Sequence, residues 1–204
     1  CVQQRKNAMP HLRTASEMKL HHVWPQQAGK ALPQNEQLAW KIASVAADPV
    51  PLDPSAAEMA ALRIMDDWAV AVAALDRPSV AAARGIARAH PRRNGATVIG
   101  LGSLEFDPYW AGYANATAIR ELDFNDSFFA VDSSHPGDTI GPIVAVAQAR
   151  GASTEALLRG IVIAYEIQVA LVKGIALNKH RIDHVAHLGP AVAAGLGAML
   201  RLDT

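Results

Sequence analysis

Cysteine is almost missing from this chain of 204 residues, which has only Cys1. No disulfide can therefore form within the chain, and no cluster of thiolates can hold a metal ion. Proteins with so little cysteine are typical of reducing compartments, so we expect a cytoplasmic protein.

An excess of charge of either sign is also missing. The chain has 19 basic and 19 acidic side chains, and its formal net charge is zero. Nucleic-acid-binding domains have a clustered basic excess, so we expect no nucleic-acid partner. The most apolar stretch, residues 188–202, is interrupted by Gly189, Pro190, Gly195 and Gly197. A membrane-spanning helix needs about 20 apolar residues, so we expect no membrane partner either.

Aromatic residues make up only 5% of the chain, although half of its residues are hydrophobic. Such a composition, rich in alanine, favours closely packed helices and an all-α fold. Residues 1–34 are polar and show no periodicity, and they are expected to be an extended or disordered arm. Residues 35–204 are expected to form one helical domain. Apolar residues at three- and four-residue spacing and helix-end signals predict helices over 36–47, 55–75, 78–90, 108–121, 138–150, 153–172 and 190–200.

The ends and faces of these helices are predicted from single residues. Residues 55–58, Ser-Ala-Ala-Glu, form a capping box that predicts the start of the second helix. Its large apolar side chains, Met59, Leu62, Met65 and Val72 among them, are expected to face the core, with Asp66 and Asp67 in solvent. Other helix ends are predicted at Asp107 with Pro108, at Gly151 and at Ser153.

Two short segments lie outside the helical pattern. Residues 97–99, Thr-Val-Ile, are the only run that resembles a β-strand. Arg92, Arg93 and Asn94 predict a basic turn, which is either a surface loop or a clamp for a phosphate or carboxylate. The helix after Ser153 is apolar nearly all round, so Glu166 and Gln168 on it are candidates for burial.

Polar residues gather in the stretch 115–141, between apolar helices. It contains His135 and four aspartates, Asp123, Asp126, Asp132 and Asp138. Buried carboxylates and imidazoles cost free energy unless they are paired, hydrated or facing a ligand, so this stretch predicts a ligand site. The alternatives are purely structural roles: Asp126 and Asp138 would be turn or N-cap residues, and each histidine would be an ordinary surface or capping residue. The cluster matches no known metal-ligand motif, so neither a metal nor another cofactor is expected.

Residues 122–127, Leu-Asp-Phe-Asn-Asp-Ser, and 134–141, Ser-His-Pro-Gly-Asp-Thr-Ile-Gly, resemble the MmgE/PrpD family. Residues 164–168 and 181–195 strengthen this resemblance, which covers nearly everything from Met18 onward. The family implies a large helical domain and a smaller α/β lid domain, usually in homodimers. Because the first residue is Cys1 and not Met, we expect the numbering to begin inside a longer product. Because family members are much longer, we expect the chain to be truncated before the lid domain.

The resemblance also implies which residues line the site. They are Asp123, Ser127, His135 and His184. Histidine can donate or accept a proton near neutral pH, so His135 and His184 are the acid and base candidates, in either order. Asp123 would orient a histidine, and Ser127 would bind a substrate carboxylate. Two further residues, Lys179 and Arg181, are candidate charge partners of the substrate.

Family members are lyases and isomerases that act on small polycarboxylates without a metal. We therefore expect a hydro-lyase that dehydrates 2-methylcitrate to 2-methylaconitate in propionate catabolism. A decarboxylase of cis-aconitate or an epimerase of the same family is an alternative. So is a helical dimerisation or binding piece without activity, because part of the pocket would be absent.

Overall fold

The computed structural model describes residues 29–204, so the predicted arm lies almost wholly outside the described residues. The chain divides into two units, of which one ends at Lys41 and the other runs from Ile42 to Thr204. A short 3-10 turn, η1 (Gln34–Glu36), precedes helix α1 (Leu38–Ala46). The candidate site lies in the second unit, which is described below.

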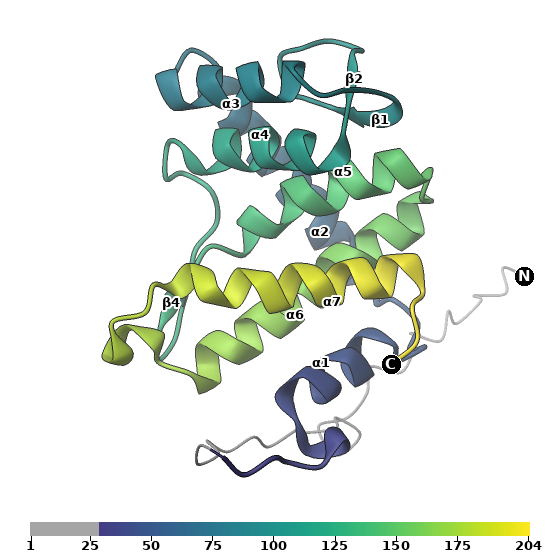
Figure 1. Ribbon diagram of the computed structural model, residues 1–204, viewed down its shortest axis with the longest axis vertical. Coiled ribbons are helices and arrows are strands. Elements are labelled where there is room, and N and C mark those ends of the chain that lie inside the picture. Colours follow the sequence, from purple (N-terminus) through teal and green to yellow (C-terminus); the bar gives the residue numbers. More distant parts are fainter. Residues whose placement is uncertain (1–28) are drawn as a thin grey trace, which may run out of the picture. The chain divides into compact units, whose positions relative to one another are not determined.

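Helices dominate the second unit, which confirms the all-α prediction (Figure 1). Two antiparallel strand pairs and three 3-10 turns connect the helices. The elements after α1 are α2 (Pro54–Ala73), α3 (Pro78–Arg88), β1 (Pro91–Thr97), β2 (Glu105–Phe106), α4 (Pro108–Arg120), β3 (Phe128–Phe129), β4 (Ser133–Ser134), η2 (Pro136–Thr139), α5 (Ile140–Arg150), α6 (Thr154–Gly174), η3 (Leu177–His180), η4 (His184–His187) and α7 (Leu188–Leu200).

Three predicted helix ends are confirmed. Asp107 caps α4 through its side chain, which accepts the amide of Tyr109 at 3.0 Å, and Pro108 follows in the first turn. Gly151 ends α5 with φ of 60°, a left-handed conformation that glycine adopts without strain. Ser153 accepts the amide of Ala156 and caps α6.

The predicted capping box at Ser55 is wrong. The N-cap of α2 is Asp53, whose Oδ1 accepts the amides of Ser55 at 2.8 Å and Ala56 at 3.2 Å. The Ser55 hydroxyl donates to the same oxygen. A carboxylate one residue before Pro54 is the better cap, because it satisfies two amides and complements the positive end of the helix dipole.

The predicted face of α2 is also wrong. Met59, Leu62 and Met65 are 50%, 50% and 68% exposed, whereas Asp67 is completely buried. The buried side of α2 is lined by small residues, because Ala60 packs among side chains of α5 and α6, and Ala71 packs with residues of α3 and α4. Small residues let a helix lie close to its neighbours, so residue size rather than hydrophobicity decided the orientation.

The predicted basic turn and the predicted strand are replaced by a hairpin. Arg92, Arg93 and Asn94 belong to β1, which pairs with β2 through a bulge, and of residues 97–99 only Thr97 lies in the strand. Phe106 of β2 is 3% exposed and packs against α3, so burial of this ring anchors the hairpin. Arg92 binds Asp107 at 3.0 Å.

Two helix pairs approach each other at backbone distance. A Cβ on Gly195 of α7 would lie 2.5 Å from the carbonyl oxygen of Gly160 of α6, and a Cβ on Gly112 of α4 would lie 3.1 Å from Pro142 of α5. The α6 and α7 helices run antiparallel and side by side (Figure 1). The segment that joins α4 to α5 lies near the start of α7, and so does the segment that joins α6 to α7 (Figure 1).

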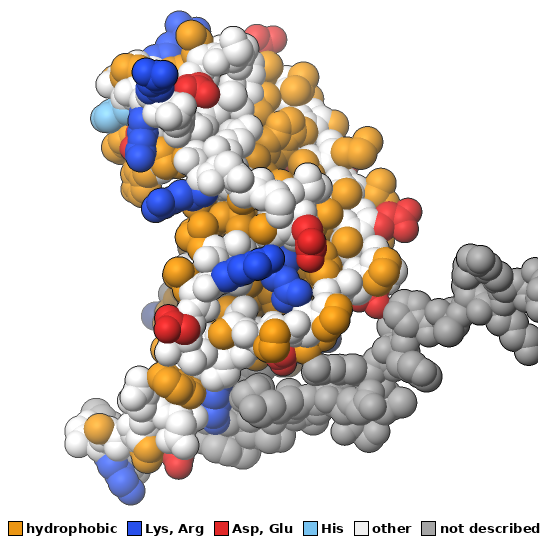
Figure 2. Space-filling view, turned by 90° about the vertical axis from the view of Figure 1, so that its right-hand side faces the viewer, with side chains coloured by type: hydrophobic (Ala, Val, Ile, Leu, Met, Phe, Trp, Pro, Cys, Tyr) orange, Lys and Arg blue, Asp and Glu red, His pale blue; other side chains and the backbone are white. Residues whose placement is uncertain are grey.

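The surface shows no large single-sign patch on the face drawn in Figure 2, where hydrophobic side chains lie among scattered basic and acidic groups. Within residues 29–204, no helix combines the length and the hydrophobicity that crossing a bilayer requires.

Candidate active site

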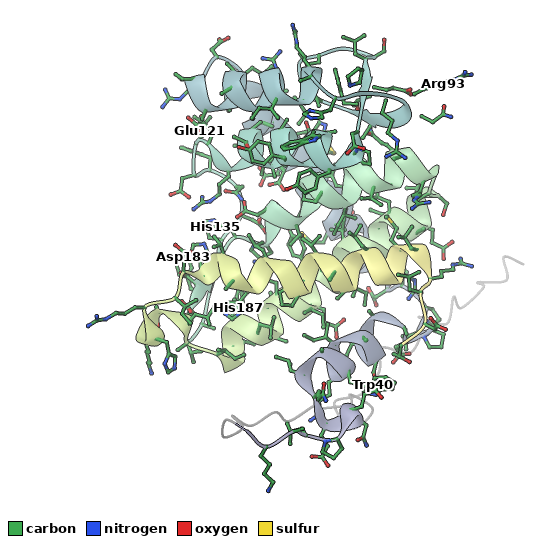
Figure 3. The ribbon with its side chains drawn as sticks, in the orientation of Figure 1. Trp40, Arg93, Glu121, His135, Asp183 and His187 are labelled. Atoms are coloured by element: carbon green, nitrogen blue, oxygen red, sulfur yellow. The ribbon has the colours of Figure 1, made fainter. Side chains whose placement is uncertain are left out.

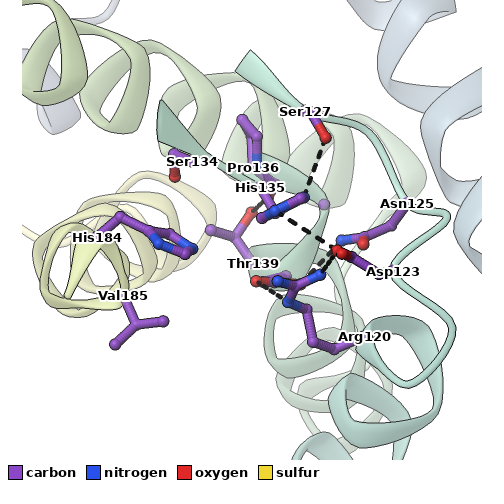
Figure 4. Close-up of polar contacts among 12 residues, drawn as sticks. Arg120, Asp123, Asn125, Ser127, Ser134, His135, Pro136, Thr139, His184 and Val185 are labelled. Carbon is purple, nitrogen blue, oxygen red and sulfur yellow. Dashed lines mark hydrogen bonds and ion pairs between the residues drawn. The ribbon is translucent and has the colours of Figure 1, made fainter. Parts of the chain in front are cut away.

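The two connecting segments bring His135 and His184 together. Their ring centroids are 5.6 Å apart and their planes are tilted by 54°. His135 lies between β4 and η2, whereas His184 opens η4 just before α7. Figures 3 and 4 show His135 on the segment after α4, facing the segment that carries Asp183 and His184. The predicted meeting of the two histidines is therefore present in the fold.

His135 is held on both sides of its ring. Its Nδ1 lies 3.1 Å from the backbone oxygen of Asp126 and 3.2 Å from the hydroxyl oxygen of Ser127. Because a carbonyl oxygen can only accept, Nδ1 carries the hydrogen, and the lone pair is on Nε2. That nitrogen lies 3.7 Å from Asp123 (Figure 4). The ring can therefore take up a proton at Nε2, facing a carboxylate.

Asp123 is positioned by Arg120. The backbone at Asp123 is left-handed, with φ of 55°, and its carboxylate forms a close ion pair with the Arg120 guanidinium. This pair and its hydrogen bond hold the pKa of Asp123 below its usual range, so the carboxylate stays ionised. Arg120 was not predicted as a site residue. Its place at the end of α4, only three residues before Asp123, is the signal that could have identified it.

His184 is bound on one side of its ring only. Its Nδ1 lies 3.2 Å from Asp183, whose carboxylate also accepts the amide of Val185. Its Nε2 is buried and has no hydrogen-bond partner among the residues that the structure describes. An unpaired buried nitrogen costs free energy, so this nitrogen is a reasonable contact for a ligand.

Lys179 and Arg181 lie on the segment that also carries His184 but are not bonded to the histidine pair among residues 29–204. Both are exposed on the segment that joins α6 to α7, and Arg181 ends η3 in a left-handed conformation. Over residues 29–204, no hydrogen bond or ion pair joins either side chain to Asp123, His135 or His184. Arg120 instead supplies the cation at the site.

Asp126 and Asp138 connect two turns instead of capping helices. Asp126 accepts the amide of Gly137 at 2.8 Å, and Asp138 accepts from the side chain of Asn125 at 2.9 Å. Asp138 also lies 3.8 Å from Arg120. The expectation of a capping role is wrong for Asp138. For Asp126 the expectation is right in part. Its carboxylate accepts an amide of the first turn of η2, as a cap would, but Asp126 lies eleven residues before that amide and not next to the turn.

Gln168 of α6 holds the residue directly before His135. It is fully buried, as its place on an apolar helix suggested, and its amide donates to the hydroxyl of Ser134. Ser134 precedes His135 directly and is itself fully buried. Glu166, the other candidate for burial, is exposed.

The two histidine side chains are only partly exposed, 15% for His135 and 22% for His184. Phe124 and Phe129, on the same segment, are 79% and 76% exposed. A cavity of about 160 Å³ lies elsewhere, between α2 and α6, and is lined by Met59, Arg63, Ile161 and Tyr165 among others. Among residues 29–204 no group of three or more His, Cys, Asp or Glu side chains is arranged to hold a metal ion.

Comparison with known families gives one match that covers most of the chain. The model of the MmgE/PrpD N-terminal domain matches residues 36–204. This range contains every residue of the site described above.

Comparison with individual proteins gives shorter matches. A 2-methylcitrate dehydratase of Salmonella typhi is 34% identical over 119 residues, which are 53% of this chain and 24% of that protein. A mitochondrial 2-methylcitrate dehydratase of Yarrowia lipolytica is 34% identical over 121 residues, which are 54% of this chain and 23% of that protein. An alkylcitrate dehydratase of Talaromyces stipitatus is 33% identical over 107 residues, which are 45% of this chain and 23% of that protein. The chain thus matches about a quarter of the length of these relatives.

Proposed function

The chain belongs to the MmgE/PrpD family, and from that premise we propose that it forms part of a hydro-lyase that dehydrates 2-methylcitrate to 2-methylaconitate. The observation that carries the proposal is the meeting of His135 and His184, with Asp123 and Ser127 beside the first ring. Proteins similar to this chain are named dehydratases of 2-methylcitrate or an alkylcitrate, which supports this substrate class.

The proposed reaction is an elimination of water by two histidines. His135 takes a proton at Nε2 from the carbon next to a substrate carboxylate, and the Asp123 carboxylate faces the positive charge that forms on the ring. The electron pair of the broken C–H bond forms the alkene. The hydroxyl group on the neighbouring carbon leaves as water, with a proton from His184.

The substrate carboxylates need hydrogen-bond donors and positive charge. Ser127 is placed for this role, because its oxygen accepts from Nδ1 of His135 and its hydrogen is then free to donate to a ligand. Arg120 adds a guanidinium beside Asp123. Lys179 and Arg181 remain proposed contacts with the anion, from the segment that also carries His184.

The setting of this activity is part of the same proposal. Residues 35–204 would be a helical domain preceded by a polar arm, and further chain would complete the pocket around the histidine pair. A cytoplasmic homodimer that acts in propionate catabolism, without a cofactor, is the assembly we expect.

The test is the formation of a conjugated alkene from 2-methylcitrate, followed by ultraviolet absorbance with the complete protein that contains this chain. The variant His184→Ala is expected to lose at least about 100-fold in rate, since acid or base catalysis contributes roughly 10²–10⁴-fold. The matched control is His180→Ala, because His180 is exposed on the same segment. Unchanged turnover in His184→Ala would remove His184 from the mechanism.

Two other outcomes separate the alternatives. A decarboxylase would release carbon dioxide from cis-aconitate, and an epimerase would change configuration without forming an alkene. If the complete protein gives no product from any of these acids, the domain is a binding or dimerisation piece. Turnover by the 204-residue chain alone would show that no further chain is needed.

A further inference from the structure

Asp67 of α2 is a carboxyl group that the proposed mechanism does not use. Its side chain is completely buried, and neither oxygen has a hydrogen-bond partner among the described residues. A buried, unpaired carboxylate ion is costly, so this group needs either a proton or a partner.

The two oxygens of Asp67 lie against Gly137, two residues after His135. A Cβ on Gly137 would lie 2.7 Å and 2.8 Å from them, and 2.6 Å from Oδ1 of Asp126. Two carboxyl groups from separate elements therefore crowd one glycine. Any side chain at this position would collide with them.

The two carboxyl groups differ in their partners. Asp126 accepts the Gly137 amide, and its other oxygen lies 3.9 Å from Arg63. Asp126 therefore has one hydrogen-bond donor and one cation beside its carboxyl group. Asp67 has no such donor, so the proton belongs on Asp67.

The charges around Asp67 point in the same direction. Burial is the largest cause that raises the pKa of Asp67, to about 8, and the negative charges of Asp126, Asp66 and Asp138 add to it. Arg63 opposes the rise, but its guanidinium is shared with Asp66 and Asp126. From α6, the buried hydroxyl of Tyr165 faces the same group of carboxylates.

We propose that Asp67 is a positioning residue for the candidate active site, which as a neutral carboxyl lets the turn of His135 and Gly137 close onto α2, and which opens that turn when it ionises. The proposal rests on the proposed function only in treating His135 as a site residue. What it claims is that the charge of Asp67 changes the position of this turn.

Ionisation would place two negative charges beside one glycine, away from water. Their repulsion is strong where the effective dielectric constant is low, so one of them has to move. The α2 backbone is held by its helix, whereas η2 is a single short turn. The turn is therefore the part that moves, and it takes His135 away from His184.

The experiment is a pH titration by NMR of the protein with ¹³C-labelled aspartate carboxyl groups and ¹⁵N-labelled backbone, from pH 5 to 10. With the histidine rings ¹³C-labelled as well, we expect the Asp67 carboxyl carbon, the Gly137 amide and the His135 ring to shift together with a midpoint near pH 8. In Asp67→Asn, which keeps the shape without the charge, the shifts of Gly137 and His135 at that midpoint should disappear.

The matched control is Asp66→Asn, the exposed neighbour on α2. It should keep the transition and lower its midpoint, because one like charge is removed. A transition that persists in Asp67→Asn, or an Asp67 carboxyl that titrates near pH 4, overturns the proposal. The readout does not need enzyme activity, so it stays decisive even if the proposed function fails.

Discussion

The carboxylate of Asp132 accepts the backbone amide of Asn178 at 3.2 Å and so connects the segment of His135 to the segment of His184. Its other oxygen accepts the amide of Ser133 at 2.9 Å. Asp132 is only 6% exposed, and these amide hydrogen bonds hold its pKa below the usual range. One side chain thus links the two histidine-bearing segments by a hydrogen bond.

We predict that Asp132→Asn lowers stability and separates the two rings, because an amide nitrogen cannot accept a hydrogen bond from a backbone amide. The denaturant midpoint should fall, and contacts between the His135 and His184 rings in NMR spectra should weaken. The control Asp76→Asn, at an exposed position, should change neither.

The same contact predicts a pH dependence. The pKa of Asp132 is depressed in the folded state, so its stabilisation is present above the ordinary aspartate pKa of about 4 and is lost as the pH falls through the folded value. Asp132→Asn should remove this component of the acid destabilisation. If the wild type and the variant lose stability in parallel below pH 4, Asp132 does not make this contribution.

A second prediction concerns the contact between α6 and α7. Gly195→Ala should destabilise the fold by about 1–3 kcal/mol, because its Cβ would lie 2.5 Å from the Gly160 carbonyl oxygen, and backbone cannot easily move aside. The control is Gly85→Ala in α3, where a Cβ would meet open space. That change should stabilise by about 0.5–1 kcal/mol, since alanine is the better helix former. Chemical denaturation of both variants measures the difference in sign.

A third prediction concerns Asp123. Arg120→Gln should raise the pKa of Asp123, because the guanidinium is the main cause of its lowering. A ¹³C titration of the labelled carboxyl group measures this directly. Arg77→Gln removes a different ion pair, with Glu121, and should leave the Asp123 titration unchanged. A pKa of Asp123 that stays the same in Arg120→Gln would contradict the ion pair.

A fourth prediction follows from the buried Asp67. Its pKa is raised in the folded state, to about 8, so the unfolded chain binds fewer protons between about pH 4 and 8. The free energy of unfolding should therefore fall as the pH rises through this range. Because a tenfold change in proton affinity corresponds to ~1.4 kcal/mol, the fall is on the order of a few kcal/mol. In Asp67→Asn this fall should be absent, whereas Asp66→Asn should keep it.

A fifth prediction tests Ser127 in the proposed reaction. Ser127→Ala should lower kcat/KM for 2-methylcitrate by roughly 10–100-fold, the cost of one hydrogen bond to a charged group. Ser127→Thr keeps the hydroxyl and should restore most of the activity. Ser103→Ala, at an exposed position, is the control for expression and folding. Equal activity of the Ala and Thr variants would mean that the Ser127 hydroxyl does not bind substrate.

Local features of the fold could be predicted because their causes are local. Asp107 with Pro108, Gly151 and Ser153 act on amides within a few residues, so their signals are visible in the sequence. The family-like motifs likewise pointed to His135 and His184 before their distance was known. The wrong face of α2 has a different cause. Hydrophobic periodicity reports which side of a helix is apolar, but close packing against helices α3 to α6 selected the side with alanines.

By itself, the sequence determined the helical class, most helix ends and the residue types that can transfer protons. The tertiary structure alone decided that Arg120 rather than Lys179 or Arg181 supplies the cation beside Asp123, that Asp132 joins two distant segments, and that Asp67 is buried against Gly137. The physical reason is distance along the chain. A cap or a turn depends on neighbouring residues, whereas burial and charge depend on elements that meet only after the helices have packed.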